Sequence, residues 1–143
     1  MSKALDIVDL LNLAVERGAS DLVLTVGLPP MIKIDGEFHP SEHEPLNPQE
    51  TRRLMYALMD EKQQRNFEED KELDFSFSLP GKGRCRVNVF MQRGSVGGVL
   101  RVVPTLIKSF EDLGLPKNIG DLALSPRGLF LVTGPTGSGK STT

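Results

Sequence analysis

The spacing of apolar and polar residues predicts one helix and then several short strands in the first part of the chain. Residues 4–17 carry apolar side chains at helical spacing, and Gly18 is suited to end that helix. Alternation by twos then predicts strands over residues 21–26 and 31–34. The dipeptide Asp35–Gly36 favours a tight hairpin that leads into a third short strand.

Capping residues mark the starts of two further helices. Asn47 precedes a proline and stands three residues before Glu50, which is the pattern of a capping box. This helix is expected to run to residue 59. Asp60 and Gln63 repeat the pattern, and they predict a short helix that ends near residue 69.

A meander of three strands follows, over residues 73–79, 84–92 and 95–103. The expected fold class is therefore α/β of the α+β kind, with a mainly antiparallel sheet and flanking helices in a domain of residues 1–113. Residues 114–127 hold several helix breakers around a short helical segment, and we interpret them as an interdomain linker. A second domain would then begin at residue 128.

The turn between the last two strands predicts their register. If Arg93–Gly94 is a two-residue hairpin loop, Gln92 faces Ser95. One face of the hairpin is then entirely apolar, which supports the register. On the other face, Arg86 on one strand lies directly opposite Arg101 on the next.

Two opposed arginines need an explanation, because like charges about 5 Å apart across a sheet are destabilising. An anion between Arg86 and Arg101 is one explanation, and a phosphate fits because the guanidinium fork binds its oxygens in two places. Neutralisation by Asp74, Glu72 or another carboxylate is a second, and exposure of both side chains to water is a third.

The strongest candidate for chemistry is the pattern G-x-x-x-x-G-K-[ST] in residues 134–141, which we call the P-loop. An apolar run at residues 129–133 predicts the buried strand that precedes such a loop. Because these 143 residues offer this strand no sheet to join, we expect little ordered contact at the P-loop. Lys140 would reach the β- and γ-phosphates of ATP, and the Ser141 hydroxyl would bind Mg²⁺. The predicted nucleotide-binding residues are Gly134, Pro135, Thr136, Gly137, Ser138, Gly139, Lys140, Ser141 and Thr142.

Composition and charge narrow the class of protein. The net charge of −2 and the sequence pI of about 5.7 do not favour a nucleic-acid binder. The sequence contains no signal peptide and no apolar run of the roughly 20 residues needed to span a membrane. Its one cysteine, Cys85, cannot form an internal disulfide, which indicates a cytosolic compartment, and we expect its side chain to pack in the core. His39 and His43 are conceivable metal ligands, but a solvated loop is the usual structure for such spacing.

The chain resembles the N-terminal portion of the type II/IV secretion ATPases, and within them the retraction motors of type IV pili. The matching stretches are residues 18–22, 27–31 and 35–36, residues 73–77 with 84–88, and residues 126–141. The resemblance implies a PAS-like N-terminal domain joined to a RecA-like ATPase domain in a homo-oligomeric, hexameric ring. It also implies a cytoplasmic motor that uses ATP and Mg²⁺ and lies at the inner membrane through pilus platform proteins, driving pilus retraction and twitching motility.

The resemblance also assigns roles to single residues. Arg86 and Arg101 match arginines that close over the ATP phosphates in this family, Arg84 is a weaker candidate, and Lys140 matches the P-loop lysine. Many relatives have a histidine where this chain has Val23, so the role of that histidine is not carried over. The family's Walker B segment and its acidic and histidine boxes lie beyond residue 143, so we expect no ATP turnover by these residues alone.

Other functions remain open from the sequence. A start close to residue 1 favours retraction, while an extension or secretion ATPase of the same family is an alternative. A second alternative is a non-enzymatic PAS-like interaction module with a non-functional P-loop. A third is a RecA-like helicase, which the low pI and the lack of a basic, aromatic-rich groove disfavour.

Overall fold

The computed structural model describes residues 5–103, 108–135 and 138–143. Contacts between residues divide the chain into two compact units, residues 1–105 and 106–143, and each is described by itself. Within the residues described, the first unit holds a sheet and three helices, and the second holds one short helix. The domain boundaries expected from the sequence, at residues 113 and 127, stay predictions.

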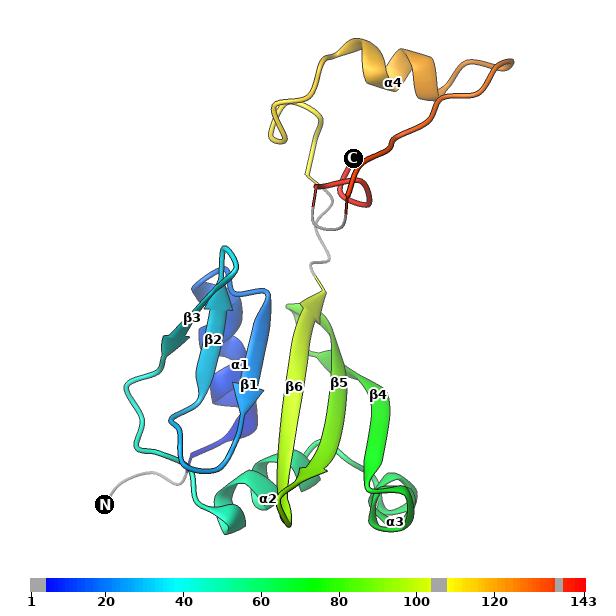
Figure 1. Ribbon diagram of the computed structural model, residues 1–143. Helices are drawn as coiled ribbons and strands as arrows, with labels where there is room; N and C mark the ends of the chain where they lie inside the picture. Colours follow the sequence, from blue (N-terminus) through cyan, green and yellow to red (C-terminus); the bar gives the residue numbers. More distant parts are fainter. Residues whose placement is uncertain (1–4, 104–107, 136–137) are drawn as a thin grey trace. The chain divides into compact units, whose positions relative to one another are not determined.

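The first unit is built on one six-stranded antiparallel sheet (Figure 1). Its strands are β1 (Asp21–Leu24), β2 (Met31–Ile34), β3 (Glu37–Pro40), β4 (Glu72–Leu79), β5 (Gly83–Gln92) and β6 (Ser95–Val103). Their order across the sheet is β3-β2-β1-β6-β5-β4. The pairing of β1 with β6, in which Leu22 is opposite Leu100, joins two local three-stranded meanders into a single sheet. The mixed α/β fold with a mainly antiparallel sheet and flanking helices is thus as predicted.

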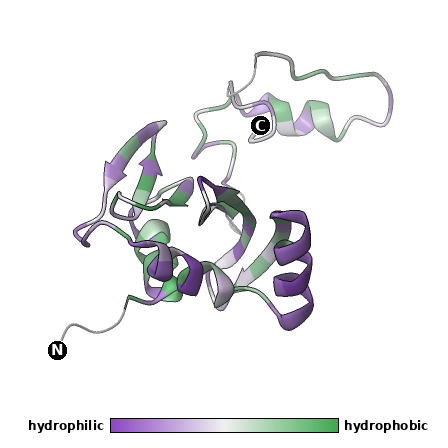
Figure 2. Cartoon of the chain, turned by 60° about the horizontal axis from the view of Figure 1, so that its bottom comes forward, coloured by the Kyte–Doolittle hydropathy of each residue, from purple (hydrophilic) through white to green (hydrophobic). Residues whose placement is uncertain are grey.

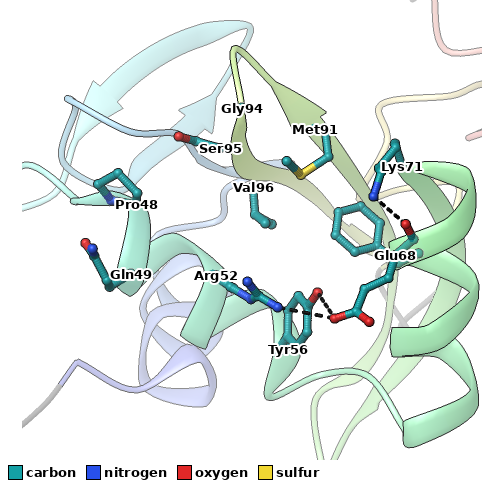
Figure 3. Close-up of a pocket in the computed structure, with 11 residues that line it drawn as sticks. Pro48, Gln49, Arg52, Tyr56, Glu68, Lys71, Met91, Gly94, Ser95 and Val96 are labelled. Carbon is teal, nitrogen blue, oxygen red and sulfur yellow. Dashed lines mark hydrogen bonds and ion pairs between the residues drawn. The ribbon is translucent and has the colours of Figure 1, made fainter.

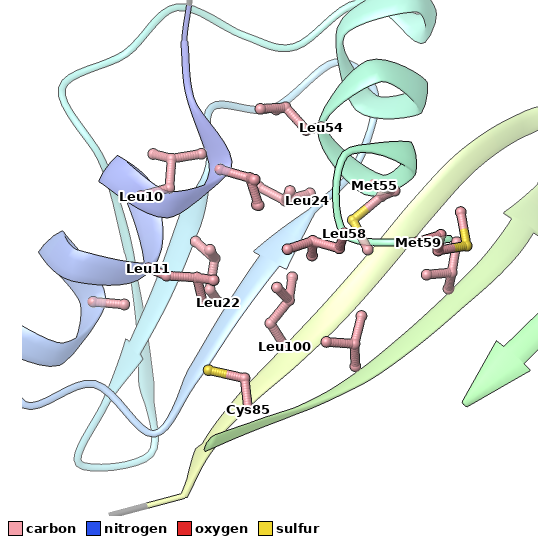
Figure 4. Packing of buried hydrophobic residues seen from close by; sticks show 14 of the residues in the cluster. Leu10, Leu11, Leu22, Leu24, Leu54, Met55, Leu58, Met59, Cys85 and Leu100 are labelled. Atoms are coloured by element: carbon pink, nitrogen blue, oxygen red, sulfur yellow. The ribbon is translucent and has the colours of Figure 1, made fainter. Parts of the chain in front are cut away.

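The three helices of this unit, α1 (Ile7–Glu16), α2 (Pro48–Tyr56) and α3 (Glu61–Asp70), bury their apolar residues in one core with the sheet. Figure 4 shows Leu11 of α1 beside Leu22 of β1, with Leu10 of the same helix in the same cluster. Met55 of α2 packs against Gly98 of β6, because a Cβ atom at that glycine would lie 2.5 Å from the Met55 methyl carbon. The close approach of α2 to β6 therefore depends on a residue without a side chain.

The predicted capping boxes are present. The Asn47 side chain accepts a hydrogen bond from the Glu50 N–H at 2.9 Å, and the Glu50 carboxylate accepts one from the Asn47 N–H at 2.9 Å. Asp60 and Gln63 form the same pair of bonds at 2.8 and 2.9 Å. These local signals place the starts of α2 and α3 where the sequence predicts them.

The predicted two-residue hairpins are also present. Asp35 and Gly36 have φ values of 49° and 88°, and Arg93 and Gly94 have values of 51° and 77°. Two successive residues with positive φ are typical of the type I′ turn, which matches the twist of the strands on either side. The second turn confirms the predicted pairing of β5 with β6.

The face of the sheet that points away from this core is polar. A row of paired residues crosses it from β2 to β5, in the order Lys33, Asp21, Arg101, Arg86. In this row Asp21 separates Lys33 from the two arginines, so one residue of opposite sign flanks the arginine pair on the β1 side. Apolar residues of the same strands point into the core. Figure 2 shows this separation of hydrophilic and hydrophobic positions along the strands.

The second unit contains α4 (Asn118–Ala123), which lies inside the segment predicted to be a linker with a short helix. The strand predicted at residues 129–133 is not formed, and the side chains there are exposed, with Leu129 at 83% and Leu131 at 68%. A strand needs a neighbour to satisfy its backbone groups, and the described residues of this unit contain no other strand. Among the described residues, none of the helices has the length and apolar character that crossing a membrane requires.

Candidate functional site

The arginine pair predicted from the turn is present on the polar face of the first unit. Arg86 on β5 is the register partner of Arg101 on β6. Their side chains are 70% and 69% exposed, so both are accessible to a ligand from the solvent. Arg84, the weaker candidate, is exposed on the same face next to Val103.

Each arginine of the pair has a carboxylate partner, as the second explanation from the sequence required. The Nε atom of Arg101 donates to Oδ1 of Asp21 at 3.0 Å. The Nε atom of Arg86 lies 3.6 Å from Oδ1 of Asp74. Glu72, the other predicted partner, instead accepts a hydrogen bond from the Asn88 side chain at 3.1 Å. The repulsion between the arginines is thus offset from both sides.

The two carboxylates differ in burial. The side chain of Asp21 is 9% exposed, and its second oxygen accepts a hydrogen bond from the Ser20 hydroxyl at 2.8 Å. The side chain of Asp74 is 52% exposed, and its ion pair with Arg86 is longer than a hydrogen bond. Arg101 is therefore held by a buried carboxylate whose two oxygens both accept hydrogen bonds. Arg86, in contrast, has an exposed partner whose attraction is weakened by solvent.

Asp21 was not identified from the sequence as a partner of Arg101. Its place on the polar face could have been predicted, because Leu22 and Leu24 define the apolar face of the strand. What the sequence did not reveal is that β1 pairs with β6. This pairing brings together Asp21 and Arg101, which are 80 residues apart in the chain. No local signal carries such a pairing.

Around the pair lies a small depression of about 190 Å³, lined by Asp21, Asp74, Arg86, Asn88, Val99 and Arg101. Because each arginine meets its carboxylate through Nε, the terminal nitrogens of both guanidinium groups remain as donors for a further acceptor. Two exposed guanidinium groups side by side suit an oxyanion such as phosphate.

The second candidate element is the P-loop in the second unit. Two of its predicted residues, Thr136 and Gly137, lie outside the described residues. The ammonium group of Lys140 donates to the carbonyl oxygens of Gly134 at 2.7 Å and Pro135 at 2.8 Å. The lysine side chain therefore folds back over the described part of the loop, where the negative ends of two backbone carbonyl dipoles attract its positive charge.

A single helical turn begins at the end of this loop. The N–H groups of Thr142 and Thr143 donate to the carbonyl of Gly139 at 3.1 and 3.0 Å. Gly139 has a φ of 93°, a conformation that residues with side chains rarely adopt. Ser141, the predicted magnesium ligand, is exposed within this turn. A glycine of positive φ followed by a nascent helix and an exposed lysine fits a phosphate-binding loop.

A further cavity, of about 510 Å³, lies between α2, α3 and the β5–β6 turn (Figure 3). The Arg52 guanidinium stands 4.8 Å from the centre of the Tyr56 ring and donates to Glu68 at 3.2 Å. The Tyr56 hydroxyl also donates to Glu68, at 3.1 Å, and burial together with this bond raises the pKa of Tyr56. These groups satisfy one another, so we interpret the cluster as a polar contact between two helices.

The remaining candidate residues have structural surroundings. Cys85 is 1% exposed in the core, and burial raises the pKa of its thiol, which confirms the predicted packing role. The Nδ1 atom of His43 lies 3.1 Å from the Ser41 hydroxyl. Within residues 5–103, 108–135 and 138–143, no group of three or more His, Cys, Asp or Glu side chains is arranged to hold a metal ion.

Comparison with known protein-family profiles gives no match. Individual proteins do match. The chain is 47% identical over 139 residues to the type IV pilus retraction ATPase PilT of Pseudomonas aeruginosa, which covers 97% of this chain and 40% of that protein. It is also 47% identical over 133 residues to the type IV pilus ATPase PilU of the same organism, covering 93% of this chain and 35% of that protein.

Solved structures give the same relationship. A crystal structure of the pilus retraction motor PilT with bound ADP superposes with a TM-score of 0.78 and 48% identity, over 96% of this chain and 40% of that one. The Legionella pneumophila ATPase DotB superposes with a TM-score of 0.80 and 25% identity, over 99% of this chain and 42% of that one.

Sequence and fold together relate this chain to the secretion and pilus ATPases. More specifically, it is homologous to the N-terminal portion of the type IV pilus ATPases PilT and PilU. The chain spans 40% of the length of the PilT relative and 35% of the PilU relative. The resemblance stated from the sequence is thereby confirmed.

Proposed function

We propose that the chain is the N-terminal part of a hexameric, ATP-hydrolysing motor that drives type IV pilus retraction and twitching motility. The observation that carries the proposal is the 47% identity to PilT over 97% of the chain. The P-loop pattern and the arginine pair in its predicted register support it. In this proposal residues 1–113 are the PAS-like domain, residues 114–127 are a linker, and residues 128–143 begin a RecA-like ATPase domain.

The proposed mechanism is a closing of the PAS-like domain over ATP. Lys140 and the backbone N–H groups of the P-loop would hold the phosphates, and the Ser141 hydroxyl would hold Mg²⁺. The magnesium ion neutralises charge on the phosphates when it is bound. Arg86 and Arg101 then present their terminal nitrogens to the phosphates and stabilise the charge that develops during transfer.

The setting of the motor is part of the same proposal. The intact protein works in the cytoplasm as a homo-oligomeric ring, and it reaches the inner membrane through pilus platform proteins without inserting into it. It has no nucleic-acid partner, which agrees with the net charge of −2.

The test is ATP hydrolysis and calorimetric binding of Mg-ATP by the intact motor that this proposal implies. Lys140→Ala removes the phosphate-binding ammonium, and we expect both binding and turnover to be lost. Arg86→Ala and Arg101→Ala should lower turnover about a hundredfold or more, since arginine contacts to a transferring phosphoryl group are worth that much. Arg65→Ala, which removes an arginine of α3 outside the site, is the matched control. Unchanged turnover in Lys140→Ala would refute the proposal.

A protein made of these 143 residues alone should not hydrolyse ATP. The family resemblance places the residues that polarise the attacking water outside this segment, and positioning of that water is essential to phosphoryl transfer. The measurement is phosphate release by the highly purified 143-residue chain. Release that disappears in Lys140→Ala would show that the segment is sufficient for turnover.

One observation favours another role within the same family. PilU matches the chain at the same 47% identity as PilT, and DotB shares the fold, so a pilus or secretion ATPase of another role also fits. Deletion of the gene separates the two: loss of a retraction motor leaves pili on the cell surface, whereas loss of an extension motor leaves none.

A non-enzymatic module is favoured by a different observation. Both arginines already have carboxylate partners, and Lys140 is bonded within its own loop, so no ligand is needed to explain them. Such a module would bind its protein partner equally well with and without Lys140→Ala. The motor instead binds ATP and loses that binding in Lys140→Ala, whereas a module with a non-functional P-loop binds no ATP in either form, so ATP binding by the unsubstituted protein separates the two functions.

A further inference from the structure

We propose that Asp21 is a positioning residue, which holds Arg101 by its Nε atom and thereby aims the terminal guanidinium nitrogens at the phosphates of ATP. Asp74, by contrast, competes with the phosphates for Arg86. The proposal rests on the proposed function for the identity of the ligand. It adds that the Arg101 side chain is held in place before ATP binds, whereas the Arg86 side chain is free to move.

The first observation is the surroundings of Asp21. Its carboxylate is nearly buried, at 9% side-chain exposure, on the otherwise polar face of the sheet. A buried carboxylate is costly unless its oxygens are bonded, and here Oδ1 accepts from Arg101 while Oδ2 accepts from Ser20. Ser20 in turn is tied to β2, since its N–H donates to the Lys33 carbonyl at 2.8 Å. The carboxylate is therefore fixed by backbone on two strands.

The second observation is the atom through which Arg101 is held. The carboxylate meets Nε, the donor nearest the aliphatic stem, at 3.0 Å. Among the described residues, no hydrogen bond reaches the terminal nitrogens of Arg101, and its side chain is 69% exposed. A guanidinium group anchored at Nε keeps a planar pair of donors for a second oxyanion. The anchor also removes rotamer freedom before a ligand binds, which favours binding.

The third observation is the contrast with Arg86. Its partner Asp74 is 52% exposed and 3.6 Å away, which is an ion pair without a hydrogen bond. Exposed pairs of this kind contribute little, so a phosphate can displace Asp74 at small cost. For the same reason Asp74 competes with the phosphates for Arg86. The charge of Asp21, by contrast, is already compensated by its bonds to Arg101 and Ser20.

The first experiment observes the anchor directly, in the 143-residue chain. Nitrogen-15 NMR of arginine side chains reports each Nε–H, with Arg101→Lys used to assign the Arg101 signal. We expect this Nε–H to exchange with water about tenfold or more slowly than that of Arg86, because a bond to a buried carboxylate must open first. Asp21→Asn should abolish the protection and Asp74→Asn should leave it intact, with backbone amide spectra showing that both variants are folded. Equal exchange at both arginines in the unsubstituted chain overturns the proposal.

The second experiment measures function in the intact motor. Asp21→Asn should lower kcat/KM for ATP by about ten- to a hundredfold, since a contact misplaced by about 1 Å can cost a hundredfold. Asp74→Asn should lower KM, since it removes a competitor of the phosphates. Asp70→Asn, at the exposed end of α3, is the neutral control. A fall of kcat/KM in Asp74→Asn as large as that in Asp21→Asn would contradict the distinction.

A double-mutant cycle separates positioning from a general structural effect. If Asp21 acts through Arg101, then Asp21→Asn should cause no further loss in an Arg101→Ala background. A further loss of the same size in that background overturns the proposal. Failure of this proposal can be told apart from failure of the proposed function. Unchanged turnover in Lys140→Ala would refute the motor, whereas the exchange rate of the Arg101 Nε–H decides separately whether Asp21 anchors Arg101.

Discussion

At the scale of single residues, Cys85 shows how burial turns a side chain into a determinant of pH-dependent stability. Its thiol is 1% exposed in the core, and burial raises its pKa above the ordinary value of 9.0. A raised pKa means that the thiol's contribution to stability is complete below pH 9.0 and is lost as the pH rises from there through the folded-state value. The physical reason is that the unfolded chain ionises first and is thereby favoured.

The measurement is urea unfolding of the chain and of Cys85→Ala at a series of pH values. The unsubstituted chain should be more stable than the variant near neutral pH, by about 1 kcal/mol for the lost buried atom. This advantage should shrink as the pH rises above 9.0. Comparison with the variant cancels other groups that titrate there, and an advantage that does not change with pH would contradict the prediction.

Single residues also show the limit of inference from the sequence. The opposition of Arg86 and Arg101 was predictable because a two-residue turn fixes every pair along a hairpin. Asp74 lies on the neighbouring strand of the same meander, so it too could be named. Asp21 could not, since its contact with Arg101 depends on a strand pairing across 80 residues.

At the scale of elements, the approach of α2 to the sheet depends on Gly98. Replacement by alanine would place a Cβ atom 2.5 Å from the methyl carbon and 2.6 Å from the sulfur of Met55, which is itself fully buried. Overpacking of this kind typically costs about 1–3 kcal/mol, with the lower part of that range expected because methionine is flexible.

The prediction is tested by chemical unfolding of Gly98→Ala and of the double variant with Met55→Leu. The shorter leucine should recover part of the lost free energy of unfolding, so the two substitutions should be non-additive. Gly36→Ala, at a position where open space surrounds the residue, serves as a comparison in which only backbone strain at a φ of 88° acts. Additive losses would mean that contact with Met55 is not the cause.

Elements whose signals are local were predicted well. The starts of α2 and α3 follow from capping boxes, and the hairpins from residues that accept positive φ. The strand at residues 129–133 was not formed, although its composition is typical of a buried strand. Composition can indicate what a segment prefers, but a strand also needs a neighbour, and its own residues cannot supply one.

At the scale of the whole molecule, the first unit has a hydrophobic core, whereas none of the described residues of the second unit is buried. The first unit buries a continuous cluster of apolar side chains between its helices and the sheet. In the second unit, Leu129, Phe130, Leu131 and Val132 are all exposed. A run of four exposed apolar residues is unusual at the surface of a folded protein, and such runs are typical of sites that contact other protein surfaces.

This difference leads to opposite expectations for one substitution in two settings. In the 143-residue chain, Leu131→Asp should leave the thermal midpoint of unfolding unchanged, because the side chain is 68% exposed, and it should reduce aggregation. In the intact motor the same substitution should abolish Mg-ATP binding, since the proposal places this run as the buried strand before the P-loop, where an unpaired charge is severely destabilising. Leu100→Asp is the control: its site is fully buried in the first unit, so it should unfold the chain in both settings. If Leu131→Asp leaves ATP binding by the intact motor unchanged, residues 129–133 are not the strand that supports the P-loop, and the assignment of residues 128–143 to a RecA-like domain falls with it.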